Sequence, residues 1–391
     1  MQYKIRLAVM ALVTALAACG DGGSDGPRTS AVRVVGDSLN DSGTFGFKFT
    51  VQDALKGTRI WVDHVVEAVG SDAVCARHVA LSEFSVVENP VAVNCTSYAV
   101  GKARINVWDN DPKLTAGDGS PFSISHQLES MSQARAFGPE ELLLVDGGGN
   151  DVADLLRAFL MFSSEVQQRL APAETSYFQL LGESSIVPAE VDETYLAEAG
   201  GRYMQALADK LADDLTRFAI DRGAQRVVVL NIPALTQTPY LQAIESVLAQ
   251  RFGGGVGGEA AAAGVMQMVD QWVRAFNAKL QQRFAGATRV AVVDLYTPFS
   301  DWVSNPKTYG FTDSTHIACP QEEGKADGFD LPVYVLGNCQ AWRLSAYPPA
   351  DASSPNWWQT YVFSDDFHGS PMTNRKMADL VVEMLKDRDW L

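Results

Sequence analysis

Ser38 is the residue whose setting first suggests covalent chemistry. It belongs to the stretch Gly-Asp-Ser-Leu-Asn-Asp-Ser-Gly at 36–43, directly after the apolar, β-branched run 31–35, which predicts a buried strand. A serine that follows such a strand lies at the carboxyl edge of a sheet, where open α/β sheets place their active sites. The same residues also suit an ordinary turn or helix N-cap, so this stretch alone does not establish a nucleophile.

His368 is the candidate base for Ser38. A serine hydroxyl becomes a good nucleophile only when a neighbouring base takes its proton, and that base must itself be oriented. Asp365 precedes His368 by three residues, a spacing that lets its carboxylate reach the imidazole, fix the tautomer and favour the imidazolium. Asp366 is the competing carboxylate, which we rank second. The other histidines are expected on a polar helix face or in loop-like, polar contexts without a matching motif: His64, His78, His126 and His316.

Two further stretches offer donors for the oxyanion that forms when a nucleophile attacks an ester carbonyl. The apolar run 141–146 is followed by three glycines and then Asn150, whose side-chain amide can donate while the glycines allow close approach of the backbone. The alternative interpretation is a simple Gly-Asn turn after a strand. In the second stretch, 97–103, the backbone N–H of Gly101 is a candidate donor on weaker grounds.

The elements that must position these residues follow from the apolar pattern. Short, continuous apolar runs predict parallel strands covered on both faces, at 31–35, 141–146, 226–231 and 289–294. Helical patterns separate the runs, at 200–222, 265–284 and 372–387. Strands that alternate with helices predict an α/β layered fold. Because the strands spread over the whole chain, we expect one domain, 30–391, with insertions near 165–200 and 236–264.

The second insertion contains the helical pattern 240–252 and the glycine-rich run 253–258. The run includes a G-x-G-x-x-G pattern, but it follows a helix rather than a strand, so a dinucleotide site is not predicted. We expect the glycines to act as a hinge and the apolar side of the helix to cover an acyl pocket, which would favour longer acyl chains. The alternative is a surface excursion without a role in catalysis.

Four blocks in chain order resemble those of the SGNH hydrolases, also called GDSL esterases and lipases: they surround Ser38, Gly101, Asn150 and Asp365 with His368. The resemblance covers nearly all of 31–391. Trp-Val-Asp at 61–63 is a further match, and 309–319 resembles a segment of the larger bacterial lipase and lecithinase-like branch.

The resemblance implies a three-layer α/β/α, flavodoxin-like fold with a mainly parallel sheet of about five strands. It implies ester hydrolysis through an acyl-serine intermediate, with Ser38 as nucleophile, His368 as base and Asp365 as its partner. The Ser38 N–H, the Gly101 N–H and the Asn150 side chain would form the oxyanion hole. No metal or cofactor is implied, and the partner is an ester or lipid-like small molecule whose chain length stays open.

Two departures leave the shapes of the acyl and alcohol pockets open. Gly-Ser-Pro follows His368 where many relatives have Pro-Thr, and Lys102 stands where a second glycine is common. One alternative function is an acyltransferase that uses the same intermediate. The other is a non-catalytic surface lipoprotein that binds glycan or lipid, which would be expected to lack one of the motif residues; all of them are present.

Residues 1–18 indicate a lipoprotein signal peptide. Lys4 and Arg6 give a basic start, and the run from 7 to 18 is apolar except for one threonine and too short to span a bilayer. The ending Leu-Ala-Ala-Cys resembles the bacterial lipobox, which predicts lipidation of Cys19, a flexible tether over 19–29 and an outer-membrane location facing the periplasm or the outside. The alternative is a plain secretory signal and a secreted protein.

The remaining cysteines are even in number, which in an exported chain predicts two disulfides: Cys75, Cys95, Cys319 and Cys339. Three pairings are open, and the spacings favour Cys75–Cys95 and Cys319–Cys339. Zinc is not expected, since neither C-x-x-C nor a paired histidine spacing occurs. The formal net charge of −16 becomes more negative when the basic start is removed, which disfavours nucleic acid and anionic lipid surfaces as partners.

Overall fold

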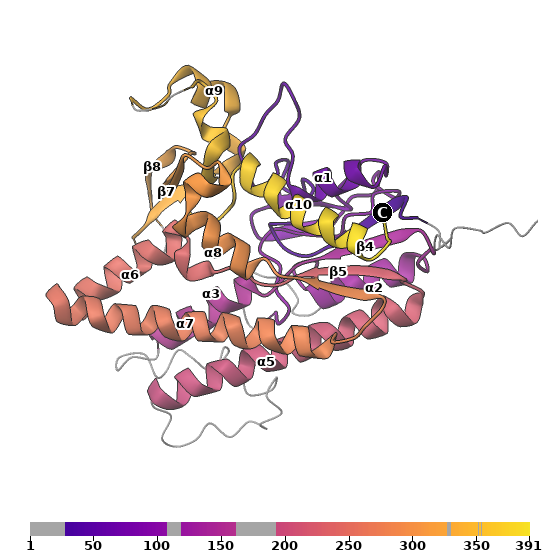
Figure 1. Ribbon diagram of the computed structural model, residues 1–391, viewed down its shortest axis with the longest axis horizontal. Helices are drawn as coiled ribbons and strands as arrows, with labels where there is room; N and C mark the ends of the chain where they lie inside the picture. Colours follow the sequence, from indigo (N-terminus) through magenta and orange to yellow (C-terminus); the bar gives the residue numbers. More distant parts are fainter. Residues whose placement is uncertain (1–27, 108–118, 162–192, 327–329, 351, 353) are drawn as a thin grey trace, which may run out of the picture.

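The structure is a computed structural model that describes residues 28–107, 119–161, 193–326, 330–350, 352 and 354–391 (Figure 1). The predicted signal peptide, Cys19 and the tether up to residue 27 lie outside the described residues, as does most of the insertion near 165–200. Thr29, which we placed in the tether, is instead buried and donates from its hydroxyl to the Trp390 carbonyl over 2.7 Å. The folded domain therefore includes Thr29.

A parallel sheet of four strands forms the centre of the fold. Its order is β1 (Ala31–Val35), β4 (Glu141–Val145), β5 (Arg226–Leu230) and β6 (Val290–Val293), and every pairing is parallel. Each strand matches a predicted run to within one residue at either end. The expectation of about five strands is wrong for the described residues. The position beside β1 holds only an isolated parallel bridge between Val34 and Ser97, in which Val34 donates to the Thr96 carbonyl and accepts from the Tyr98 N–H.

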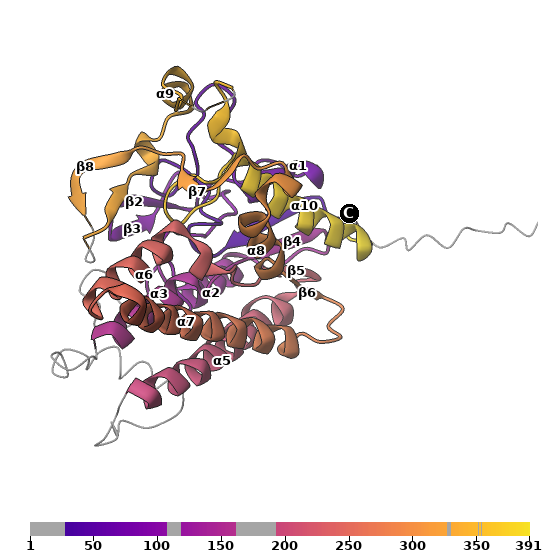
Figure 2. The same ribbon diagram turned by 60° about the vertical axis from the view of Figure 1, so that its left-hand side comes forward.

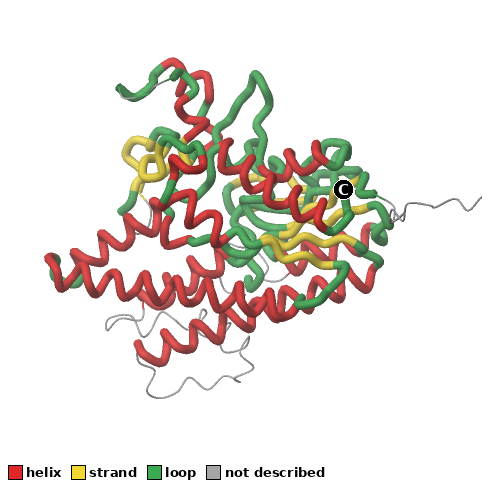
Figure 3. Tube along the Cα trace, in the orientation of Figure 1, coloured by secondary structure: helices red, strands yellow, loops and turns green. Residues whose placement is uncertain are grey.

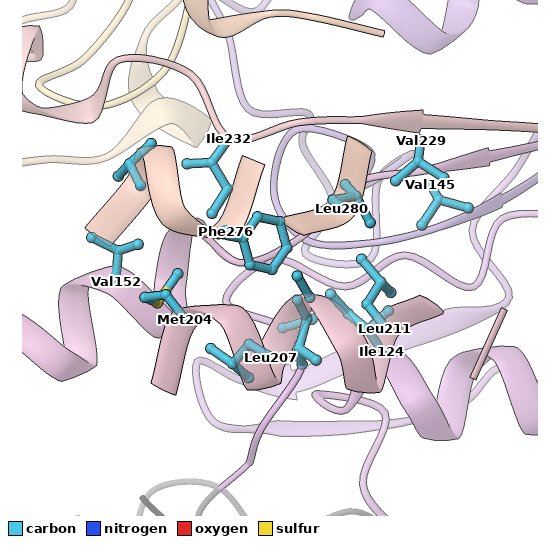
Figure 4. Packing of buried hydrophobic residues seen from close by; sticks show 14 of the residues in the cluster. Ile124, Val145, Val152, Met204, Leu207, Leu211, Val229, Ile232, Phe276 and Leu280 are labelled. Atoms are coloured by element: carbon cyan, nitrogen blue, oxygen red, sulfur yellow. The ribbon is translucent and has the colours of Figure 1, made fainter. Parts of the chain in front are cut away.

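Alternate side chains of the sheet face two separate cores, so the fold has three layers (Figures 1 and 3). One face is covered by α1 (Trp61–Ala68), α8 (Tyr296–Ser304) and α10 (Pro371–Asp387). The other is covered by α2 (Ile124–Ala134), α3 (Gly149–Met161), α5 (Glu193–Phe218) and α7 (Gly255–Arg283). In Figure 4, Phe276 of α7 lies among Ile232, Met204 and Leu207. The predicted three-layer α/β/α fold is confirmed.

Three small strand pairs surround the sheet. β2 (His78–Ser82) pairs antiparallel with β3 (Ser85–Glu88), and β8 (Gln321–Ala326) pairs antiparallel with β9 (Pro332–Tyr334). β7 (Asp313–Ile317) pairs in parallel with β10 (Tyr361–Phe363). Figure 2 shows β7, β8 and the short helix α9 (Ala341–Ala346) together at one end of the molecule. This pairing matters for function because β10 leads directly into the segment that carries His368.

The predicted helices are present with changed boundaries. The pattern at 200–222 belongs to α5, which ends at Phe218 and is followed by a short 3-10 turn and Gly223 in the left-handed conformation. The insertion near 236–264 forms a helical hairpin of α6 (Pro239–Arg251) and α7. Only residues 253 and 254 of the glycine run lie in the connection between the two helices, because residues 255–258 are part of α7. Movement about this connection stays a prediction. A Cβ at Gly258 would lie 2.2 Å from the Ala249 carbonyl oxygen, so this glycine lets the two helices pack closely.

Both disulfides that the spacing favours are formed. Cys75 is bonded to Cys95, and Cys319 is bonded to Cys339. Cys319 and Cys339 are buried in a separate apolar cluster with Leu344. The Cys319 N–H donates to the Ser364 carbonyl over 2.8 Å, which ties this cluster to the segment that carries Asp365 and His368.

Candidate active site

The predicted site residues converge at the carboxyl edge of the central sheet. Ser38 follows β1, and Asn150 lies at the start of α3, directly after β4. His368 reaches this edge from the turn between β10 and α10. The residue Ser38 is mostly buried, with a relative exposure of 7%, and the side chain of His368 is 12% exposed. The topology therefore brings together residues that are separated by more than 300 positions in the chain.

Ser38, His368 and Asp365 form a continuous hydrogen-bonded chain. His368 Nε2 lies 2.8 Å from Ser38 Oγ, and His368 Nδ1 lies 2.8 Å from Asp365 Oδ2. Because an ionised carboxylate can only accept, Nδ1 carries the proton toward Asp365 and Nε2 accepts from the serine hydroxyl. This is the arrangement in which a histidine can take a proton from serine while a carboxylate fixes its tautomer.

The charges of this chain stabilise one another. Burial disfavours the charged form of Asp365, but the nearby His368 and the backbone N–H groups of Phe367 and His368 outweigh it and hold the pKa of Asp365 below its usual range. Burial also disfavours the imidazolium of His368, but the charge and hydrogen bond of Asp365 outweigh it and raise the pKa of His368 above 6.5. Asp366 adds a smaller contribution, so the ranking of Asp365 over Asp366 agrees with this geometry.

The turn that carries Ser38 is held by groups that the sequence did not single out. Gln127 of α2 is fully buried; it accepts from the Gly36 N–H over 2.8 Å and donates to the Gly36 carbonyl over 3.1 Å. Asp146 accepts from the Asp37 N–H over 3.0 Å. Gly36 has φ 142°, and a Cβ there would lie 1.6 Å from Asp146 Oδ1, so no other residue fits.

Asp146 brings a second carboxyl group beside Ser38. Its side chain is buried, and within the described residues Asp146 Oδ2 has no hydrogen-bond partner. Burial and the neighbouring Asp37 carboxylate raise the pKa of Asp146 well above its usual value. The physical consequence is that the neutral, protonated form of Asp146 is favoured, because two adjacent buried carboxylates would repel each other.

The Asn150 side chain is directed toward the nucleophile turn. Its Nδ2 donates to the Ala103 carbonyl over 3.0 Å and to Asp37 Oδ2 over 3.3 Å. The shorter bond orients the amide, and the longer one directs the other N–H to the residue next to Ser38. Asp151, the next residue, accepts from the Ile105 and Asn106 N–H groups and ties α3 to the loop that carries Gly101.

The Gly101 N–H does not offer a free donor, which departs from our expectation. It donates to the buried carboxylate of Asp41 over 2.8 Å. The glycine is required for another reason: a Cβ would lie 2.4 Å from Phe49 Cζ, and the Phe49 ring lies 4.9 Å from that of His368. Lys102, which replaces a common glycine, has φ 69°, in the left-handed region that glycine prefers.

The Asp-x-x-His spacing occurs twice, which our sequence reasoning overlooked. Asp313 and His316 form the same contact as Asp365 and His368, with Oδ2 2.7 Å from Nδ1. The His316 side chain is 77% exposed, and among its described contacts there is no serine nucleophile. The contact of His368 with Ser38 therefore distinguishes the two motifs.

Within the described residues, no cluster of three or more His, Cys, Asp or Glu side chains is arranged to hold a metal ion. In the same part of the chain, no helix combines the length and apolar character needed to cross a membrane.

Comparisons with known proteins identify the family of this chain. A family model described as GDSL-like lipase/acylhydrolase matches residues 32–381. A GDSL esterase/lipase from Arabidopsis thaliana is 27% identical over 183 residues, which are 44% of this chain and 44% of the relative. The chain thus spans less than half the length of this relative.

Two solved structures are also similar. The extracellular lipase of Streptomyces rimosus has a TM-score of 0.34 and 14% identity, covering 70% of this chain and 82% of that one. The lipase Lip_vut3 from a goat rumen metagenome has a TM-score of 0.31 and 13% identity, covering 71% and 85%. Because the family model matches most of the chain, residues 32–381, this chain belongs to the GDSL-like lipase/acylhydrolase family.

Proposed function

We propose that this protein hydrolyses carboxylic esters through an acyl-Ser38 intermediate. The observation that carries the proposal is the hydrogen-bonded chain from Ser38 Oγ to His368 and on to Asp365, with both contacts at 2.8 Å. A serine at hydrogen-bond distance from an imidazole whose other nitrogen faces a carboxylate is the arrangement that activates the hydroxyl for attack.

In the first half of the reaction, Ser38 Oγ attacks the ester carbonyl carbon while its proton moves to His368 Nε2. The carbonyl electron pair moves onto oxygen, and the imidazolium is stabilised by Asp365. The C–O bond then breaks, and the alcohol leaves with the proton from His368. In the second half, water gives its proton to His368 and attacks the acyl-serine, and Ser38 leaves with that proton as the acid is released.

The oxyanion needs donors that face the carbonyl oxygen. The Ser38 N–H has no hydrogen-bond partner among the described residues, so it is available for this role. The Asn150 amide is the second donor, since its 3.3 Å bond to Asp37 is long and can be exchanged for one to the oxyanion. Gly101 would serve only if its bond to Asp41 were broken, so we assign it to packing against Phe49.

The direct test compares Ser38→Ala and His368→Ala with wild type on p-nitrophenyl esters. Removing one residue of a Ser-His-Asp triad lowers kcat nearly as much as removing all three, so the activity of both variants should fall to a small residual rate. His316→Ala is the matched control, because it removes a histidine from the same Asp-x-x-His motif without touching Ser38. Retention of most activity in Ser38→Ala would reject the site, and an inactive wild type would favour a non-catalytic binding protein.

We also propose that Cys19 is lipidated and anchors the protein to the outer membrane, as a lipoprotein of the lecithinase-like branch. The support comes from the Leu-Ala-Ala-Cys ending and from the residues at 309–319. Cys19→Ser should move the protein from the membrane fraction to the soluble fraction. Unchanged membrane fractionation of this variant would count against the anchor and would leave the esterase proposal untouched.

A further inference from the structure

A narrow cavity runs from Ser38 across the carboxyl ends of the sheet strands. It is lined by residues that follow each of the four strands: Asp37 and Ser38 after β1, Asp146 after β4, Asn231 after β5 and Leu295 after β6. Its apolar walls come from Ile232, Leu235, Phe299, Phe367 and Met377. The volume of the cavity is about 40 Å³.

The cavity lies on the acyl side of the scissile bond. The leaving alcohol must accept its proton from His368 Nε2, so it departs along the face of the imidazole. His368 does not line the cavity, although Ser38 does. The ring of Phe49 lies 4.9 Å from the His368 ring, and Phe49 does not line the cavity either. The part of the ester that stays bonded to Ser38 is therefore the part that enters the cavity.

The volume restricts which acyl groups fit. A cavity of roughly 150 Å³ holds a benzene molecule of six carbon atoms, and a cavity of roughly 10–15 Å³ is the smallest that holds one water molecule. The 40 Å³ beside Ser38 therefore holds about two or three heavy atoms. The walls cannot easily yield, because Leu235, Phe299 and Met377 are themselves buried core residues.

The helical hairpin does not enlarge this space. The apolar side of α6, with Leu241, Ile244 and Leu248, is buried in the core cluster that includes α7. No residue of α6 lines the cavity, and Thr238 just before it is the nearest contribution. α6 does contact the segment that carries His368, since the Tyr240 N–H donates to the Asp366 carbonyl over 2.9 Å and the Tyr240 ring lies 6.2 Å from that of Phe367. This cavity alone does not support the expectation that α6 covers a pocket for longer acyl chains.

A larger groove of about 1370 Å³ near α9 does not serve as the acyl site either. It is lined by residues around the Cys319–Cys339 disulfide, including the exposed Trp342 and Tyr347, and by neither Ser38 nor His368. Among the cavities formed by the described residues, the small cavity is the one that Ser38 lines.

Building on the proposed function, we infer that the substrates are esters of short acyl groups, with acetyl and propionyl as the groups that fill the cavity. An acyl chain of eight carbons would have to displace the side chains of Leu235, Phe299 or Met377. A misfit of even one methylene in a hydrophobic pocket changes specificity by roughly tenfold or more. The alcohol part is not restricted by this cavity.

The test measures kcat/KM for p-nitrophenyl acetate and p-nitrophenyl octanoate with the full chain, below the micellar concentration of the longer ester. Both esters release the same alcohol, so the ratio reports acyl fit alone. We expect acetate to exceed octanoate by at least tenfold. A ratio below ten overturns the inference and leaves the proposed function standing. Failure of the proposed function is recognised separately, by activity that survives Ser38→Ala.

Enlarging the cavity tests the cause of the preference. Leu235→Ala should lower the acetate-to-octanoate ratio at least fivefold, because it removes a wall that faces the acyl group. Leu344→Ala is the matched control: it truncates another buried leucine, in the separate cluster around Cys339, and should leave the ratio unchanged. Leu235→Val is the milder variant if Leu235→Ala fails to fold. An unchanged ratio in a folded Leu235 variant overturns the inference.

Discussion

The partner of His368 gives the sharpest prediction. Asp365→Asn keeps the size of the side chain but removes the charge that favours the imidazolium. The neutral amide can also donate to Nδ1, which stabilises the wrong tautomer of His368. In a serine protease the corresponding change lowers kcat about 10⁴-fold, which corresponds to about 5.5 kcal/mol of transition-state stabilisation. We expect a loss of about this size in Asp365→Asn.

The pH profile should change together with the rate. His368 must be neutral to act as a base, so kcat/KM rises as pH increases through the pKa of His368. In the wild type, the charge and hydrogen bond of Asp365 raise this pKa, which moves the acid limb to higher pH. In Asp365→Asn, burial becomes the main influence and lowers the pKa of His368, because Asp366 and Asp37 contribute less. The acid limb of the variant should therefore move to lower pH than that of the wild type.

The assay is kcat/KM for p-nitrophenyl acetate from pH 4.5 to 9, with product release corrected for ionisation of the nitrophenol. Asp366→Asn is the matched control, since it removes the adjacent carboxylate and leaves Asp365 in place, whose Oδ2 lies 2.8 Å from His368 Nδ1. It should shift the acid limb slightly downward and keep most of the plateau. An unmoved acid limb in Asp365→Asn, or a larger loss in Asp366→Asn, would refute the reasoning.

Three further predictions concern the surroundings of Ser38. Asn150→Ala should lower kcat by roughly 10²–10³ with little change in the urea midpoint, because an oxyanion donor is lost from a half-buried position; an unchanged kcat would remove Asn150 from the oxyanion site. Gly101→Ala should destabilise the fold by about 1–3 kcal/mol in urea denaturation and reduce activity, since the new methyl group must displace Phe49 from beside His368; wild-type stability would contradict this packing role. Replacing both Cys319 and Cys339 by serine should cost about 3 kcal/mol of unfolding free energy, and activity should be lost at a lower temperature than secondary structure; coincident losses by circular dichroism and activity would contradict the link through Ser364.

The central sheet was predictable because parallel strands are covered on both faces and therefore appear in the sequence as short, continuous apolar runs. The Asp365–His368 pair was predictable for a similar reason, since the spacing lets the two side chains meet locally. The same spacing at Asp313 and His316 shows the limit of this argument. Only the tertiary fold decides which histidine meets Ser38.

Other features depend on contacts between distant segments, which spacing does not encode. The N–H of Gly101 is bonded to Asp41, sixty residues earlier in the chain, so its expected role was misassigned. Gln127 and Asp146 hold the nucleophile turn, but a glutamine in a helix and an aspartate after a strand carry no motif. The glycine run at 253–258 suggested a hinge, whereas its last member, Gly258, lets α7 pack closely against Ala249 of α6.

The central claim is that Ser38 is made nucleophilic by His368. Reaction with a fluorophosphonate, followed by peptide mass spectrometry, measures this directly, because the reagent forms a stable bond with activated serines. We expect a single adduct on the peptide that contains Ser38, and we expect His368→Ala to prevent it while His316→Ala leaves it unchanged. An adduct on a different serine, or equal labelling of Ser38 in His368→Ala, would contradict the claim.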